Sequence, residues 1–190
     1  MGRWEPDAGL RLVRAAVDLF TEQGYDSTTV AGIAERAGLT KATFFRYFPD
    51  KREVLFAGQS THGSLLAEGI GAAPGPATPL EAVAAGLDAL AGSFTPEQRE
   101  FGPRLQAVIA GNSDLQERAA FKRAGLAAAM TTALRGRGVP DPAAGLAAEL
   151  GVRAFYRAFD RWTDGRERRT FSAVARQELD ELRTAITMLG

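Results

Sequence analysis

The sequence predicts an all-α protein with about nine helices. Apolar residues recur with the helical period in almost every segment, and no run of alternating β-branched residues competes with that pattern. Several segments begin with Pro in the first turn or with Ser, Thr or Asp as a cap, which marks helix starts. The stretch GAAPGPATP, residues 71–79, is the clearest loop in the chain.

The composition is typical of a folded protein, with 45% hydrophobic and 24% charged residues. No stretch approaches the roughly 20 uninterrupted apolar residues that a membrane-spanning helix needs. The start, MGRWEPDAG, has no apolar core for export. We therefore expect a cytoplasmic protein with no membrane partner.

Few residues suited to catalysis are present. The chain has no cysteine, which excludes disulfides, thiolate metal sites and cysteine nucleophiles. Its one histidine, His62, lies in the polar stretch QSTHGS and is expected to be a solvated residue on a helix surface. There is no Gly-rich phosphate loop or pair of carboxylates arranged for acid–base chemistry. An enzyme on a helical scaffold is thus the weaker hypothesis, and no cofactor or metal is expected.

The first predicted helix is amphipathic. Its apolar residues fall three and four positions apart, and Gly24 follows them as a glycine at a helix end does. The buried stripe is expected to consist of Leu10, Val13, Val17 and Phe20.

Two short helices follow. Thr29 is the expected N-cap of VAGIAERA, which Gly38 ends, and Thr40 is the expected N-cap of KATFFRYF, which Pro49 ends. Two short helices joined by a tight Gly-containing turn, with a first helix to brace them, predict a helix-turn-helix.

The placement of polar residues on the second short helix favours DNA as the partner. Residues 27–56 contain five basic and three acidic residues, a modest excess. Lys41, Thr43, Phe45 and Arg46 project from a helix of two turns, which suits a major groove of about 12 Å. The spacing of Phe44 and Phe48 predicts a buried stripe on the opposite side.

Phosphate contacts are expected at the edges of this motif. The helix N-termini at Thr29 and Thr40 offer backbone N–H groups and hydroxyls, and Lys51 would reach the DNA backbone from outside. After Lys51 a longer helix is expected to continue through VLFAGQSTHGSLLAEGI. Its three glycines each weaken it by about 1 kcal/mol, so it is a candidate soft link to the rest of the chain.

The run FTEQGYDSTTVAGIAERAGLTKATFFRYFPDKREVL resembles the N-terminal domain of TetR-family regulators almost position by position. The resemblance implies double-stranded operator DNA as a partner and assigns DNA contacts to Thr29, Thr40, Lys41, Thr43, Phe45, Arg46, Tyr47 and Lys51. One departure is Phe45, where the family commonly has Tyr, so a hydroxyl contact to phosphate is lost and Arg46 is expected to compensate.

The resemblance also predicts two domains: a helix-turn-helix domain at 6–66 and a helical effector-binding and dimerisation domain at 67–190. In the family the last two long helices form the dimer interface, and here these would be residues 143–164 and 170–188. The last helix carries an apolar stripe that faces either a partner or its own core, and the resemblance favours the partner. The stripe consists of Phe171, Val174, Leu179, Leu182, Ile186 and Leu189.

Apolar and aromatic residues in the second half are candidates to line an effector cavity, although they are also typical of a plain core or a dimer interface. They predict a largely apolar small-molecule effector of unspecified identity. The candidate ligand-binding residues are Phe94, Phe101, Leu105, Phe121, Phe155, Phe159 and Trp162.

The sequence therefore predicts a homodimeric, sequence-specific DNA-binding regulator. We expect a repressor that a small molecule releases from a palindromic operator. The alternative is a ligand-binding helical dimer that does not bind an operator.

Overall fold

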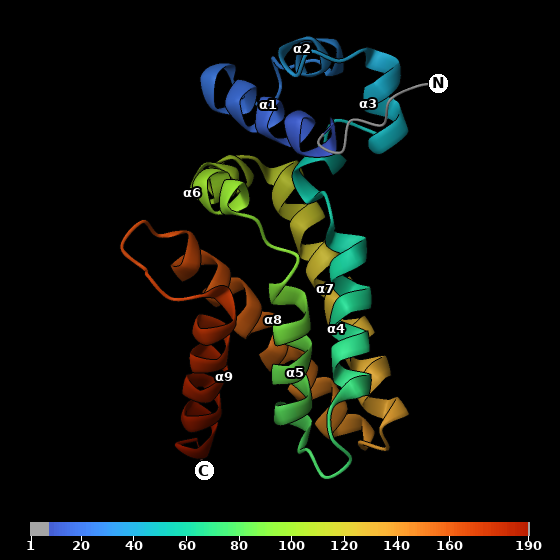
Figure 1. Cartoon of the computed structure of the whole chain (residues 1–190), viewed down its shortest axis with the longest axis vertical. Coiled ribbons are helices and arrows are strands. Elements are labelled where there is room, and N and C mark those ends of the chain that lie inside the picture. Colours follow the sequence, from blue (N-terminus) through green and yellow to red (C-terminus); the bar gives the residue numbers. More distant parts are fainter. Residues whose placement is uncertain (1–7, 190) are drawn as a thin grey trace. The chain divides into compact units, whose positions relative to one another are not determined.

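The computed structural model describes residues 8–189, and in that range it has nine α-helices, one short 3-10 helix and no strand (Figure 1). This confirms the predicted all-α fold. None of the helices in this range is long and apolar enough to cross a membrane. The elements are α1 (Ala8–Gln23), α2 (Val30–Arg36), α3 (Lys41–Tyr47), η1 (Glu53–Phe56), α4 (Gln59–Ala72), α5 (Pro79–Ala91), α6 (Pro96–Ala110), α7 (Ser113–Gly136), α8 (Asp141–Thr163) and α9 (Phe171–Thr187).

The chain forms two compact units. The N-terminal unit contains the residues up to Gly58 together with Phe101–Ala119, and the C-terminal unit contains Gln59–Glu100 and the residues from Ala120 onward. Helices α6 and α7 therefore each contribute residues to both units. The first compact unit is interrupted after Gly58. The predicted boundary at residue 66 concerns functional domains and stays a prediction.

The core of the N-terminal unit is built on one face of α1. Leu12 and Val17 have no exposed surface, and Ile33 of α2 and Phe44 of α3 are equally buried in the same cluster. Gly24 ends α1 with a φ of 85°, which agrees with the predicted helix end. The amphipathic period of α1 thus supplies the surface on which the two short helices pack.

Parts of α6 and α7 complete this unit. Phe101 and Leu115 are buried in its core, and Leu105 packs partly buried against it. An ion pair of 2.5 Å joins Nε of Arg118 on α7 to Oε1 of Glu53 in η1. The N-terminal unit therefore contains more than the three helices that the sequence predicted for it.

The continuous helix expected after Lys51 is interrupted, so that prediction is wrong. Glu53–Phe56 forms only a 3-10 helix, and α4 begins at Gln59. Between them Ala57 has a ψ of 134° and Gly58 a φ of 81°, and neither value continues a right-handed helix. The three residues before the break, Val54, Leu55 and Phe56, are all buried.

Helices α4 and α5 approach each other closely at two glycines. A Cβ at Gly69 would lie 2.7 Å from the carbonyl oxygen of Ala85, and a Cβ at Gly86 would lie 2.8 Å from that of Leu66. Gly69 lowers the helix propensity of α4, but its lack of a side chain allows α5 to pack this closely. The largest fully buried apolar side chains of the C-terminal unit surround this contact and the adjoining helices: Leu66, Ile70, Leu87, Leu90, Met130 and Leu134.

The apolar stripe of α9 faces the core of its own unit over its first half. Phe171, Val174 and Leu179 are buried there, and Leu182 packs partly buried against the same core. Leu189, by contrast, is 86% exposed. The expectation that the whole stripe meets a partner is therefore wrong for its buried members, because α8 and α5 already cover them.

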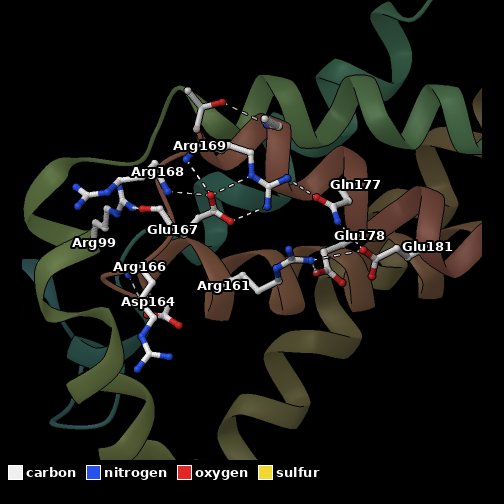
Figure 2. Close-up of polar contacts among 12 residues, drawn as sticks. Arg99, Arg161, Asp164, Arg166, Glu167, Arg168, Arg169, Gln177, Glu178 and Glu181 are labelled. Atoms are coloured by element: carbon white, nitrogen blue, oxygen red, sulfur yellow. Dashed lines mark hydrogen bonds and ion pairs between the residues drawn. The ribbon is translucent and has the colours of Figure 1, made fainter.

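Charged residues connect α8 to α9 (Figure 2). The Glu178 side chain has no exposed surface, and Arg157 Nε and Arg161 Nη1 both donate to its carboxylate, the latter at 2.6 Å. Burial alone raises the pKa of Glu178, but the hydrogen bonds from the two arginines outweigh it, so the pKa lies below its usual value. In the loop between the helices, Arg169 Nη2 pairs with Glu167 Oε2 at 2.6 Å.

Replacing Glu178 with glutamine tests the ion pair between these helices. The amide keeps the size but loses the charge, so the free energy of unfolding at pH 7 should fall by about 1–3 kcal/mol. Because folding lowers the pKa of Glu178, its stabilising effect is present above the unfolded pKa of about 4.3 and is lost as pH falls through the folded value. Urea unfolding of wild type and variant should therefore converge as the pH falls below the folded pKa of Glu178.

The matched control is Glu181→Gln, an exposed position on the same helix, which should change the free energy of unfolding little. An equal difference between wild type and Glu178→Gln at pH 7 and pH 3 would contradict the assignment.

Candidate nucleic-acid interface

The two short helices begin at the predicted caps. The Thr29 hydroxyl accepts a hydrogen bond from the Gly32 N–H at 3.1 Å, and the Thr40 hydroxyl accepts one from the Thr43 N–H at 3.1 Å. Both threonines have extended backbone, as N-cap residues do. The Oγ1 atoms of Thr40 and Thr43 also lie 3.0 Å apart. The predicted starts of α2 and α3 are thus confirmed.

The turn between α2 and α3 is held from within the unit. Gly38 has a φ of 67°, and the Leu39 N–H donates to the Ala34 carbonyl at 2.8 Å. The guanidinium of Arg11 on α1 donates to the Ala37 carbonyl and would lie 2.8 Å from a Cβ at position 38. Glycine is therefore required here both by the backbone conformation and by the approach of Arg11.

Helix α3 buries one side and exposes the other. Phe44 has no exposed surface and Phe48 is 7% exposed, which confirms the predicted buried stripe. Phe45 is 49% exposed and Tyr47 37%, and Arg46 is exposed between them. We call the outward set the α3 surface; its members are Thr40, Lys41, Thr43, Phe45, Arg46 and Tyr47.

The cations of the α3 surface lie beside its rings. Lys41 Nζ is 5.9 Å from the centroid of the Phe45 ring, and the Arg46 guanidinium carbon is 5.4 Å from that of Tyr47. Long side chains lose less freedom on binding when a neighbouring ring already restricts them. The arrangement places two positive charges and two aromatic rings on one exposed face.

The Lys51 side chain was expected to reach outward, but in the structure it turns toward the turn before α2. Its ammonium donates to the carbonyls of Tyr25 at 2.7 Å and Thr28 at 3.0 Å, and it lies 4.0 Å from the centroid of the Tyr25 ring. These contacts join the segment after α3 to the turn before α2. Lys51 thus supports the motif, and its contact with DNA stays a prediction.

The structure divides the candidate ligand-binding residues. Phe94, Phe155, Phe159 and Trp162 gather in the C-terminal unit with Phe171, and the closest pair of ring centroids, Phe94 and Phe171, is 4.6 Å apart. We call these five residues the aromatic cluster. Phe101 and Leu105 instead pack in the core of the N-terminal unit, and Phe121 is 66% exposed. The candidates are therefore not one group, because α6 and α7 are shared between units.

His62 is buried, so the prediction of a solvated histidine is wrong. Its side chain is 8% exposed, and its ring centroid lies 5.5 Å from that of Phe94 and 6.1 Å from that of Phe155. Burial lowers the pKa of His62 to about 4. The signal available in the sequence was the i, i+4, i+7 spacing of His62, Leu66 and Gly69, which puts His62 on the packed face of α4.

This burial predicts a pH-dependent stability. The unfolded chain binds a proton at His62 near pH 6.5, and the folded chain only near pH 4. The folded state should therefore lose up to about 3 kcal/mol as pH falls from 6.5 to 4. Urea unfolding at several pH values measures this change. His62→Phe should flatten the profile between pH 7 and 5, because the chain has no other histidine; a flat wild-type profile there would contradict the burial.

Comparison with known proteins identifies the helix-turn-helix. The family model described as bacterial regulatory proteins, tetR family, matches residues 12–57. The chain is 35% identical over 82 residues to the HTH-type transcriptional regulator TcmR of Streptomyces glaucescens, a match that covers 43% of this chain and 36% of TcmR. The matched region thus spans about a third of that relative's length.

Solved structures match over most of the chain at lower identity. FadR from Bacillus subtilis, in complex with stearoyl-CoA, is 20% identical with a TM-score of 0.55, over 91% of this chain and 96% of FadR. SmeT, the repressor of the Stenotrophomonas maltophilia multidrug efflux pump SmeDEF, is 20% identical with a TM-score of 0.52, over 93% of this chain and 89% of SmeT. At these identities the likeness concerns the fold. Residues 12–57 thus match the helix-turn-helix region of the tetR family of bacterial regulatory proteins.

Proposed function

We propose that the protein is a sequence-specific DNA-binding transcriptional regulator, which represses from a palindromic operator as a homodimer and is released by a small molecule. The observation that carries the proposal is the α3 surface. It presents two cations, two threonine hydroxyls and two aromatic rings on a capped helix whose opposite side is anchored by Phe44. The match of residues 12–57 to the tetR family of bacterial regulatory proteins supports DNA as the partner.

In this proposal α3 enters the major groove. Lys41 and Thr43 stand at its start, where side chains reach base edges, and the exposed Phe45 ring suits contact with a thymine methyl group. Arg46 donates to guanine or to phosphate. The hydroxyls and free N–H groups at Thr29 and Thr40 contact phosphates and fix the register without reading sequence.

The homodimer is assigned to α8 and α9, the helices that correspond to the predicted residues 143–164 and 170–188. The inner face of α9 is already covered, so a partner would meet the outward faces. The exposed apolar side chains that α8 and the end of α9 offer are Leu146, Met188 and Leu189. Two α3 helices held about 34–36 Å apart would then enter successive major grooves.

The effector is assigned to the C-terminal unit, where the aromatic cluster supplies an apolar surface. FadR, of the same fold, was solved with an acyl-CoA, which supports a ligand role for such a unit. Native mass spectrometry of the purified protein would detect a ligand retained from the cell.

Selection from random duplex DNA tests operator binding. A dimeric regulator should enrich a palindrome whose half-sites are centred about 10 base pairs apart, or a multiple of that distance. The dimer and the fold are checked on the same sample by analytical ultracentrifugation and circular dichroism. A folded dimer that enriches no palindrome would favour the alternative, a ligand-binding helical dimer without an operator.

Two substitutions separate phosphate contact from support of the motif. Arg46→Ala should lower the slope of log affinity against log salt by about one, because one fewer counterion is released, while the melting temperature stays unchanged. Lys51→Met leaves the Tyr25 and Thr28 carbonyls without their donor, so the free energy of unfolding should fall by about 1–3 kcal/mol. Fluorescence anisotropy and urea unfolding measure the two effects.

The control is Arg168→Ala, which removes the same charge from an exposed position in the loop between α8 and α9. An unchanged salt slope for Arg46→Ala would contradict the phosphate contact. A reduced slope for Lys51→Met would add a phosphate contact to the supporting role of Lys51.

A further inference from the structure

Three buried polar atoms of the C-terminal unit make no hydrogen bond of ordinary geometry. They are Oε1 of Gln59, Nδ1 of His62 and the hydroxyl of Tyr156. Among the side chains that the structure describes within residues 8–189, these three are the buried polar atoms without such a bond. Buried polar atoms in folded proteins are usually paired, so three unpaired atoms in one unit need an explanation.

The three residues lie close together. Gln59 and His62 are one turn apart on α4 and share a face of that helix. On α8 the Tyr156 ring packs against Phe155 at 4.9 Å between centroids, and Phe155 is itself 6.1 Å from His62. The Tyr156 hydroxyl also approaches Gln59 and Arg123 closely enough to interact with both, although neither contact has ordinary hydrogen-bond geometry. The central carbon of the Arg123 guanidinium lies 4.4 Å from the Tyr156 ring centroid.

Apolar surface adjoins these polar atoms. The His62 ring contacts Phe94 and Phe155, and both belong to the aromatic cluster. A site of this composition, apolar walls with a few convergent polar groups, is typical of small-molecule binding. Core packing alone would not require polar side chains at these positions, since leucine or phenylalanine would fill them without the desolvation cost.

We propose that Gln59 and His62 anchor an aromatic ligand through an uncharged hydroxyl or amine group that donates to both of them. The proposal rests on the assignment of effector binding to the C-terminal unit and adds the chemical class of the effector. The amide oxygen of Gln59 only accepts hydrogen bonds, and the neutral imidazole of His62 offers an acceptor nitrogen. The ligand must therefore bring at least one donor.

The donor group's lack of charge follows from the surroundings of His62. Burial lowers the pKa of His62 to about 4, so the imidazole is neutral at pH 7 and does not attract an anion. No carboxylate is among the polar atoms that lack a partner, so a cation finds no counter-charge among them. The aromatic rings favour an aromatic ligand because offset and edge-to-face contacts between rings add to apolar burial.

Isothermal titration with two matched probes tests the donor. 2-Naphthol carries a hydroxyl donor, and 2-methoxynaphthalene has the same ring system with the donor removed. On the whole protein 2-naphthol should bind about three- to tenfold more tightly, the effect of one buried hydrogen bond. In Gln59→Leu and His62→Phe this preference should shrink toward one, whereas Thr61→Val, an exposed neighbour on α4, should keep it.

Thermal unfolding without probe is the second readout. If the polar atoms await a ligand, His62→Phe and Gln59→Leu should melt at the wild-type temperature at pH 7 or a few degrees above it, since each removes an unpaired buried group. Equal affinity of the two probes, failure of both to bind, or a preference that persists in both variants would overturn the proposal. A lower melting temperature in both variants would also overturn the proposal. It would mean that the polar atoms already have a stabilising partner, such as a bound water, in the protein without ligand.

Operator binding by the same preparation separates this inference from the proposed function. A protein that enriches a palindrome but does not distinguish the probes leaves the regulator intact and removes the aromatic donor as effector class. A protein that distinguishes the probes but enriches no DNA keeps the ligand site and removes the operator.

Discussion

The orientation of α3 depends on the burial of one side chain, Phe44. The helix has seven residues, too few to be stable by itself in water. Phe44 has no exposed surface and lies against Phe48, so packing fixes the rotation of α3 about its axis. Arg46, two positions further on, is turned by about 200° from it and must point outward. The α3 surface is therefore a consequence of core packing in the N-terminal unit, and the two threonine caps determine only where the helices begin.

The features that were predictable from the sequence are those that neighbouring residues determine. A capping threonine accepts from a backbone N–H three residues on, so Thr29 and Thr40 could be identified without knowing the fold. The burial of Phe44 and Phe48 followed from their spacing along one helix. The resemblance to TetR-family regulators rests on the same local run. For these reasons the helix-turn-helix was predicted well, and the residues assigned to DNA contact are exposed apart from the half-buried Thr43 and Lys51; the contacts themselves stay predictions.

Features that depend on distant residues were missed. His62 stands in a polar stretch, and its burial results from Phe94 and Phe155, which lie far along the chain. The ammonium of Lys51 turns inward because the Tyr25 and Thr28 carbonyls are available to it, and no local pattern reports that. Phe101 and Leu105 were grouped with the other aromatic and apolar residues because nothing in their sequence shows which unit they join.

The division of α6 and α7 between the units changes which segments would link the proposed DNA-binding and ligand-binding regions. The sequence suggested one softened helix after Lys51 as that link, but the chain passes between the units three times: after Gly58, within α6 and within α7. Backbone rotation at Gly58 can absorb a displacement of α4, whereas an uninterrupted helix passes a displacement along its hydrogen-bonded turns. Pro103 removes one such hydrogen bond in α6. Helix α7 has no proline and is therefore the stiffest of the three connections, so a ligand that shifts its residues after Ala119 would act most directly on those before it.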